Sequence, residues 1–187
     1  NAMTQPSPRP PFLYCPWCKG DLSRENPYRQ TCASCGFILY HTSSPCVGAL
    51  PLDAQGNVLL ARRGIHPYFG DWNIVGGFLN YQEDPIEGLI REVHEETGVR
   101  CVVDRFVTMT ADVYGDNGQA LLNAYFTVKL LSDDVRPHDD VSELRWFPLD
   151  ALPDNLPFAS DRKALAALRA MRSAGGIAVG MTSAINE

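Results

Sequence analysis

The chain has 187 residues, of which 45% are hydrophobic and 20% charged, and its formal net charge is −6. This length suffices for one full hydrophobic core with a small appendage, and the composition is that of a soluble globular protein. The negative charge disfavours a general nucleic-acid binder, and no apolar run approaches the roughly 20 residues that a membrane-spanning helix needs.

The chain begins with a stretch that is predicted to have no fold of its own. Four prolines fall between residues 4 and 11, so residues 1–11 are predicted to be a disordered or extended lead. Asn1 and Ala2 precede Met3 and are set aside as the remnant of a tag. This start does not have the pattern of a signal peptide, so a cytoplasmic location is expected.

Four cysteines follow in two closely spaced pairs. Cys15-x2-Cys18 and Cys32-x2-Cys35 are separated by 13 residues, a spacing typical of a four-thiolate zinc site. The alternative is two disulfides or four free thiols. Residues 12–40 are too few to form a core alone, so bound zinc is expected to supply much of the folding free energy. Four thiolates leave no open coordination position, and the predicted zinc is therefore structural.

The rest of the chain predicts one larger domain of alternating strands and helices. Residues 41–45 are expected to be a linker, residues 46–173 the domain, and residues 174–187 a mobile tail. Apolar and β-branched runs bounded by turn residues predict the strands, and helical periodicity with capping residues predicts the helices. The predicted strands are Cys46–Leu52, Asn57–Arg63, Trp72–Val75, Cys101–Tyr114, Gln119–Leu130 and Glu143–Phe147. One helix is expected between Asp84 and Gly98, and another from Asp161 to about Arg172 with Ser160 as its cap.

The helix after Asp84 carries an unusual cluster of acidic residues. At about 100° per residue, Glu92 and Glu96 stack one turn apart with Glu95 beside them, and Arg91 can pair with Glu95. Like charges at this spacing repel by a few tenths of a kcal/mol per pair. A solvated acidic helix is one explanation. The other is a site for Mg²⁺ or Mn²⁺, which prefer hard oxygen ligands.

A longer pattern surrounds these carboxylates. Gly77, five residues, Glu83, seven residues and then the run REVHEETGV at 91–99 resemble the Nudix box in full. The resemblance implies a hydrolase that cleaves, with Mg²⁺, a nucleoside diphosphate linked to another group. It also implies an α/β fold, an α/β/α sandwich around a mixed sheet, in which the box forms a loop, a helix and a second loop beside the sheet.

The resemblance also assigns roles to single residues. Glu92 and Glu96 would hold metal ions that polarise the phosphoryl oxygens and lower the pKa of a bound water. Glu95 would be a further ligand or the water-activating base, and the carbonyl of Gly76 is a ligand candidate. Arg91 would orient the carboxylates, and Glu83 would complete the network. Some family members take the base from a later loop, where the sequence does not choose among Asp139, Asp140 and Glu143.

The groups that flank the diphosphate must be recognised by residues outside the box. Aromatic residues on loops can stack on a base, although they can equally cover the edge of the core. Neighbouring strand residues point to opposite faces, so one of the two adjacent arginines is expected to face the site, where it could contact a phosphate. The substrate-binding candidates are Arg62, Arg63, Tyr68, Phe69 and Tyr81.

Residues 12–40, with the four cysteines, are predicted to form a small zinc ribbon that precedes the larger domain. This ribbon narrows the place of the chain within the family. NADH pyrophosphatases of this family also join a four-cysteine ribbon to the box, but they carry an SQPWPFPxS motif, and no such run follows Val99. The chain more closely resembles ribbon-bearing ADP-ribose and FAD pyrophosphatases. A small nucleotide is therefore the expected partner, and a homodimer is left open. The alternative is a ligand sensor or RNA-end binder that uses its ribbon for nucleic acid. The complete set of box carboxylates favours the hydrolase.

Overall fold

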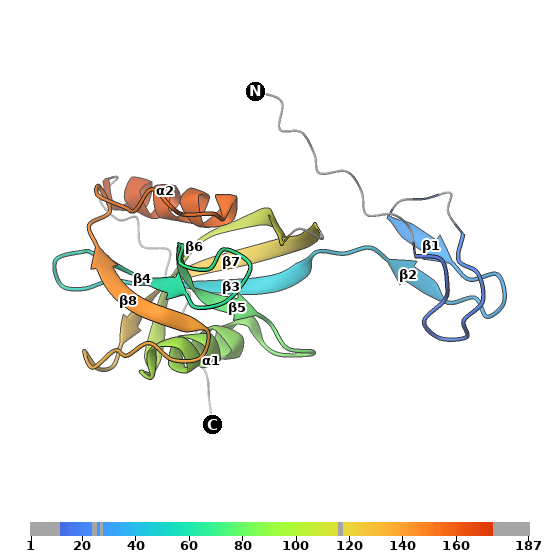
Figure 1. Ribbon diagram of the computed structural model, residues 1–187, viewed down its shortest axis with the longest axis horizontal. Coiled ribbons are helices and arrows are strands. Elements are labelled where there is room, and N and C mark those ends of the chain that lie inside the picture. Colours follow the sequence, from blue (N-terminus) through green and yellow to red (C-terminus); the bar gives the residue numbers. More distant parts are fainter. Residues whose placement is uncertain (1–11, 24–25, 27, 116–117, 174–187) are drawn as a thin grey trace. The chain divides into compact units, whose positions relative to one another are not determined.

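The computed structural model describes residues 12–23, 26, 28–115 and 118–173 (Figure 1). The chain divides into two compact units, Asn1–Ser43 with Val113–Ala120 and Ser44–Asp112 with Leu121–Glu187. The predicted lead and tail, residues 1–11 and 174–187, lie outside the described residues. Within the described part, no helix is long and apolar enough to cross a membrane.

The smaller unit is built on a two-stranded antiparallel sheet and a fully buried glutamine. Strands β1 (Arg29–Thr31) and β2 (Ile38–Tyr40) pair across the hairpin. Between them and the preceding chain, the Gln30 amide donates to the carbonyls of Phe12 and Ser23 at 2.8 Å each. Its Oε1 accepts the Phe12 N–H at 2.9 Å and bonds the His41 ring at 2.8 Å. Because a buried amide without partners would cost about 1–3 kcal/mol, this network fixes how the strands meet the segment before them.

The larger unit contains a six-stranded mixed sheet in the order β6-β7-β3-β5-β4-β8. Strand β3 is parallel to β7, whereas β3–β5, β5–β4 and β4–β8 are antiparallel. The strands are β3 (Ser44–Pro51), β4 (Val58–Arg63), β5 (Trp72–Phe78), β6 (Cys101–Tyr114), β7 (Gln119–Leu130) and β8 (Val141–Phe147).

Most predicted strands are confirmed, and the three largest changes at their ends are of two or three residues. Strand β3 begins at Ser44, inside the predicted linker, because Ser44 pairs with Leu121 of β7. Strand β5 continues through Phe78, beyond the predicted end at Val75, because its second half pairs with β3. Strand β8 begins two residues early, at Val141, which pairs with Arg63.

Helices α1 (Pro85–Thr97) and α2 (Ala159–Ser173) cover opposite faces of this sheet (Figure 1). Strand alternation explains the two cores, because successive residues point to opposite faces. On the α2 side the core includes Leu50, Leu60, Ile74, Leu165 and Leu168. On the α1 side it includes Ala49, Ala61, Val75, Leu89 and Val93. The predicted α/β/α sandwich is confirmed. Ser160, predicted as the cap of α2, instead lies within the helix, and its N–H donates to Asp112 Oδ2 at 2.7 Å.

Candidate active site

Helix α1 begins and ends where its capping residues require. The Asp84 carboxylate accepts the Ile86 N–H at 2.8 Å, and Pro85 occupies the first helical position. Gly98 ends the helix in the left-handed region at φ 72°, and its N–H donates to the His94 carbonyl at 2.9 Å. These two ends fix which residues of the helix face the sheet.

Arg91 lies at the centre of a carboxylate network. Its guanidinium binds Glu83 through two hydrogen bonds, from Nε at 2.6 Å and from Nη2 at 2.8 Å. Nη1 donates to Glu92 and to Glu95, each at 2.8 Å, and Nη2 also reaches the Phe78 carbonyl at 3.1 Å. The hydrogen bonds from Arg91 lower the pKa of Glu83 to about 2. The network therefore ties the loop before α1, the helix and the end of β5 together with a single cation.

Glu96 is held differently from the other box carboxylates. Its side chain is 5% exposed, and its Oε2 accepts the Gly76 N–H at 3.2 Å. Burial raises the pKa of Glu96 well above its usual value, and the charges of Asp140 and Glu92 raise it further. Burial also raises the pKa of Glu92, although Arg91 opposes that shift. A divalent cation would reverse both shifts, since it favours the ionised carboxylates.

Two glycines make room for these side chains on β5. Gly76 has φ 144°, and a Cβ there would lie 2.1 Å from the Val47 carbonyl oxygen of the neighbouring strand. A Cβ on Gly77 would lie 2.7 Å from both carboxylate oxygens of Glu92. The pair thus lets the backbone of β5 approach the acidic face of α1.

The oxygen-rich donor set fits Mg²⁺ or Mn²⁺, although its oxygens are not gathered on one point. Carboxylates from Glu92, Glu95 and Glu96 with a backbone carbonyl at Gly76 are the ligands such cations prefer. In the described part of the chain, however, the four cysteines are the one group of three or more metal-binding side chains whose ligand atoms all lie within 4.8 Å. Arg91 and the Gly76 N–H hold the carboxylate oxygens instead.

The three candidate bases of the later loop lie in different surroundings. Asp139 is exposed, and Glu143 pairs with Arg62 at 3.4 Å and also with Arg145. The charge of Asp140 instead raises the pKa of Glu92 and Glu96. Backbone hydrogen bonds explain why Asp140 lies close enough to act on these two carboxylates.

Two hydrogen bonds fix the segment that ends in Asp140. The His138 N–H donates to the Glu96 carbonyl at 3.1 Å, and the Gly64 N–H donates to the Asp140 carbonyl at 2.6 Å. The segment is therefore attached both to the end of α1 and to the residue after β4, and of the three candidates it is Asp140 that it brings towards the box carboxylates.

The two adjacent arginines at the end of β4 differ as strand alternation predicts. Arg62 has a side chain that is 46% exposed, and its Nε donates to the Gly70 carbonyl at 2.8 Å. Arg63 is 8% exposed, its Nε donates to the Pro67 carbonyl at 2.8 Å, and its charge lowers the pKa of Glu96. Arg63 is thus the one whose charge acts on the box.

The candidate aromatic residues do not form one cluster. Tyr68 meets Phe158 edge-on at 5.2 Å between ring centroids, and the Arg63 guanidinium lies 5.7 Å from the Phe158 centroid. Phe69 stacks on His66 at 5.9 Å, whereas Tyr81 is 91% exposed. Nothing in the sequence singles out Phe158, because an apolar residue just before a helix has no signal that distinguishes it from a core residue.

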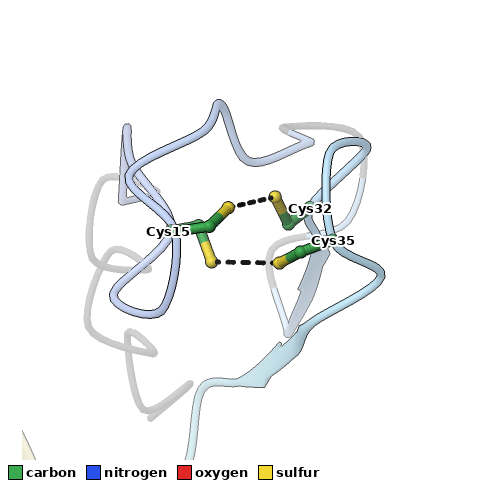
Figure 2. A group of neighbouring side chains, drawn as sticks. Cys15, Cys32 and Cys35 are labelled. Carbon is green, nitrogen blue, oxygen red and sulfur yellow. Dashed lines mark hydrogen bonds between the residues drawn. The ribbon is translucent and has the colours of Figure 1, made fainter.

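The four cysteines of the smaller unit meet at one point (Figure 2). The Sγ atoms of Cys15 and Cys35 lie 3.8 Å apart, and those of Cys18 and Cys32 lie 3.5 Å apart, without a disulfide. Four sulfurs around a tetrahedral zinc at about 2.3 Å would lie about 3.8 Å from one another. The cluster therefore fits a zinc ribbon, and the alternative of two disulfides does not describe this structure.

Each cysteine pair lies on the same kind of turn. The Lys19 N–H donates to the Cys15 carbonyl at 2.9 Å, and the Gly36 N–H donates to the Cys32 carbonyl at 3.0 Å. Lys19 has φ 65° and Gly36 has φ 75°. The residue that follows the second cysteine of each pair therefore has a left-handed backbone conformation. Glycine suits this conformation, whereas lysine adopts it at a cost.

The NUDIX domain family matches residues 42–168 of the chain. The chain belongs to the NUDIX family. The matched range contains the box, all six strands of the larger sheet and most of α2, in agreement with the architecture described above.

Named relatives of this NUDIX chain act on different nucleotides. It is 29% identical over 137 residues to an 8-oxo-(d)GTP phosphatase of Mycolicibacterium smegmatis, covering 73% of this chain and 41% of that one. It is 25% identical over 153 residues to the NAD-capped RNA hydrolase NudC of Vibrio parahaemolyticus, covering 81% and 57%. It is 26% identical over 102 residues to an ADP-ribose pyrophosphatase of Methanocaldococcus jannaschii, covering 54% and 60%. The chain spans about half the length of the curated relatives it matches.

A solved structure matches nearly the whole chain. The crystal structure of a NUDIX hydrolase from Nitrosomonas europaea superposes with a TM-score of 0.72 at 26% identity, covering 88% of this chain and 94% of that one.

Proposed function

We propose that this chain is a divalent-metal-dependent hydrolase that cleaves the pyrophosphate of a nucleoside diphosphate derivative, with ADP-ribose or FAD favoured. One observation carries the proposal: a single cation, Arg91, holds three box carboxylates while a fourth, Glu96, is buried against Gly76. An acidic helix that served only solubility would not bury a carboxylate and raise its pKa.

Different residues would bind the catalytic metal, orient its ligands and bind the structural zinc. Glu92, Glu95, Glu96 and the Gly76 carbonyl would hold Mg²⁺ or Mn²⁺. When bound, the metal would neutralise phosphoryl charge and lower the pKa of a water. Arg91, braced by Glu83, orients Glu92 and Glu95 from the side of the loop. The ribbon cysteines would hold Zn²⁺, and its role is structural because no coordination position stays open.

Asp140 is the proposed base that accepts the proton of the attacking water. Its support is the attachment of its segment to α1 and β4, together with the effect of its charge on Glu92 and Glu96. Glu95 is the alternative within the box, but one of its carboxylate oxygens already accepts a hydrogen bond from Arg91 at 2.8 Å. In this proposal Asp139 and Glu143 have no part in proton transfer.

The substrate groups beyond the diphosphate would be recognised at Tyr68 and Arg63, next to Phe158. Tyr68 is 37% exposed and is braced by the Phe158 ring, so part of its face remains available for stacking on a base. Phe69 and Tyr81 are exposed and stay substrate-binding candidates, as does Arg62.

A substrate screen with Mg²⁺ and Mn²⁺ tests this proposal. We expect the highest kcat/KM for ADP-ribose or FAD, with AMP as one product. A higher kcat/KM for an oxidised nucleoside triphosphate, for NADH or for capped RNA would overturn the substrate while keeping the hydrolase. Binding of nucleotide or RNA without any turnover would favour the sensor alternative and overturn the proposed function.

A further inference from the structure

Strand β5 changes partners in the middle. Its first half, Trp72–Ile74, pairs with β4, and its second half, beginning at Val75, pairs with β3. The change occurs between Ile74 and Val75, one residue before the glycine that contacts Glu96. A strand that leaves one neighbour and joins another needs other partners for its backbone groups at that point.

Two side chains supply these partners at Ile74. Its N–H donates to Asp161 Oδ2 at 2.9 Å, and its carbonyl accepts the side-chain amide of Asn73 at 2.9 Å. Asp161 belongs to the first turn of α2, and its other oxygen accepts the Tyr125 hydroxyl hydrogen at 2.7 Å. The point where β5 changes neighbours is thus held by a carboxylate from the helix on the far side of the sheet from α1.

Burial in the core destabilises the ionised form of this carboxylate. Asp161 is 5% exposed, and burial raises its pKa to about 6, with the charge of Asp112 adding to the shift. The hydrogen bonds from Ile74 and Tyr125 and the charge of Arg162 oppose the shift. An apolar residue at this position would avoid the cost of removing a charge from water. A role beyond packing is therefore needed to explain an aspartate at this position.

A short path leads from Asp161 to the candidate metal site. Asp161 fixes the N–H of Ile74, Gly76 follows two residues later, and the Gly76 N–H donates to Glu96 at 3.2 Å. Because Gly76 lies against the Val47 carbonyl, a small shift of β5 would change how it meets Glu96. The two helices on opposite faces are therefore connected through three residues of one strand.

We propose that Asp161 is a positioning residue for the metal site, because it fixes where β5 leaves β4 and so sets Gly76 against Glu96. The inference rests on the proposed function only in taking Glu96 and Gly76 as metal ligands. Asp161 contacts neither of them, and it acts through the backbone of β5. Loss of a partner that is bonded directly to a ligand lowers metal affinity by about 10- to 100-fold in other metal sites, and Asp161 lies one step further out, so its loss should fall near the lower end of that range.

Mn²⁺ binding in the full chain, measured by calorimetry, tests the proposal with four variants. Asp161→Ala should weaken Mn²⁺ binding by about tenfold, the lower end of the range for groups bonded directly to metal ligands. Asp161→Asn keeps an oxygen for the Ile74 N–H and should remain within about twofold of wild type, since the bond to the backbone survives. Tyr125→Phe removes only the hydroxyl and should also remain near wild type. If Asp161→Ala does not fold, Asp161→Leu, which fills the space without an acceptor, replaces it.

Leu168→Ala is the matched control for loss of packing. Leu168 lies in the same core on the same helix, and its truncation leaves the Asp161 hydrogen bonds in place. We expect it to lower stability without a comparable loss of Mn²⁺ affinity. Equal losses for Leu168→Ala and Asp161→Ala, or no loss for Asp161→Ala, would overturn the proposal.

Amide hydrogen exchange gives a readout that does not depend on turnover. The Ile74 and Gly76 amides should exchange faster in Asp161→Ala than in Leu168→Ala, and at the wild-type rate in Asp161→Asn. Faster exchange and weaker Mn²⁺ binding in a chain that hydrolyses no nucleotide would support the positioning role while the proposed function fails. Unchanged exchange in Asp161→Ala would overturn the positioning role alone.

Discussion

The ribbon and the box both gather acidic ligand groups, yet they arrange them in opposite ways. In the ribbon the four sulfurs already lie within 4.8 Å of one another. In the box, Arg91 holds Glu83, Glu92 and Glu95, and the Gly76 N–H holds Glu96. A closed cluster of thiolates suits a permanent structural ion. Carboxylates that already have partners suit a cation that exchanges those contacts when a charged substrate binds. Ligand type and local partners together therefore distinguish the proposed structural zinc site from the proposed catalytic metal site.

The largest effect should come from breaking the ribbon cluster. Cys15→Ser removes a buried thiolate and should unfold residues 12–41, because structural zinc supplies about 10–16 kcal/mol in comparable small modules. Elemental analysis should find one zinc per wild-type chain and a reduced content in the variant. Nuclear magnetic resonance should show loss of the Gln30 amide signals, while those of α1 persist. A variant with native Gln30 signals and no zinc would show that the sulfurs cluster without a metal.

The second effect concerns the pH dependence set by Asp161. Its pKa rises from 3.8 unfolded to about 6 folded, so the folded chain binds more protons in that interval. Its contribution to stability is therefore present below pH 3.8, falls as the pH rises, and is lost above about 6. Relative to Asp161→Asn, the wild-type free energy of unfolding should drop by up to about 3 kcal/mol across that window. Urea unfolding at pH 3.5 and pH 6.5 measures this. Parallel profiles for the two proteins would contradict it.

A third effect should appear in catalysis rather than in stability. Gly77→Ala places a Cβ 2.7 Å from the Glu92 carboxylate, so that side chain must move although the backbone does not need to. A displacement of about 1 Å at a reacting centre can cost about a hundredfold in rate. We expect kcat to fall by about that factor with a nearly unchanged melting temperature. Equal losses of kcat and stability would assign Gly77 to packing alone.

The smallest effect is expected from replacing Lys19, which occupies the left-handed position of the first cysteine turn, where the second turn has a glycine. Lys19 is left-handed at φ 65°, where the other turn has Gly36. Lys19→Gly should raise the stability of the zinc-loaded ribbon by at most about 1 kcal/mol, since relief of strain exceeds the added freedom of the unfolded chain. Competition with a zinc chelator measures the change. A lower zinc affinity of the variant than of the wild type would contradict this explanation of the turn.

The sequence predicted best what depends on local spacing. The cysteine pairs, the caps of α1, the alternation of Arg62 and Arg63 and most strand positions follow from residues close together in the chain. What it missed are contacts between distant segments. Asp161 bonds Ile74 across 87 residues. The charge of Asp140 acts on Glu92 and Glu96 because its segment is attached to the end of α1 and to the residue after β4. An aspartate early in a helix predicts a cap, and nothing local shows that it will support a strand instead.

The central claim is that the box carboxylates bind a catalytic divalent metal, and Glu96→Gln tests it most directly. Glu96 is buried, and the amide is nearly the same size, so the variant should fold. With ADP-ribose or FAD and a series of Mg²⁺ concentrations, kcat should fall at least about a hundredfold, as expected for a ligand that acts in the transition state. Mn²⁺ affinity measured by calorimetry should fall in parallel, while the zinc content stays at one per chain. A Glu96→Gln protein as active and as metal-responsive as wild type would contradict the metal site at the box.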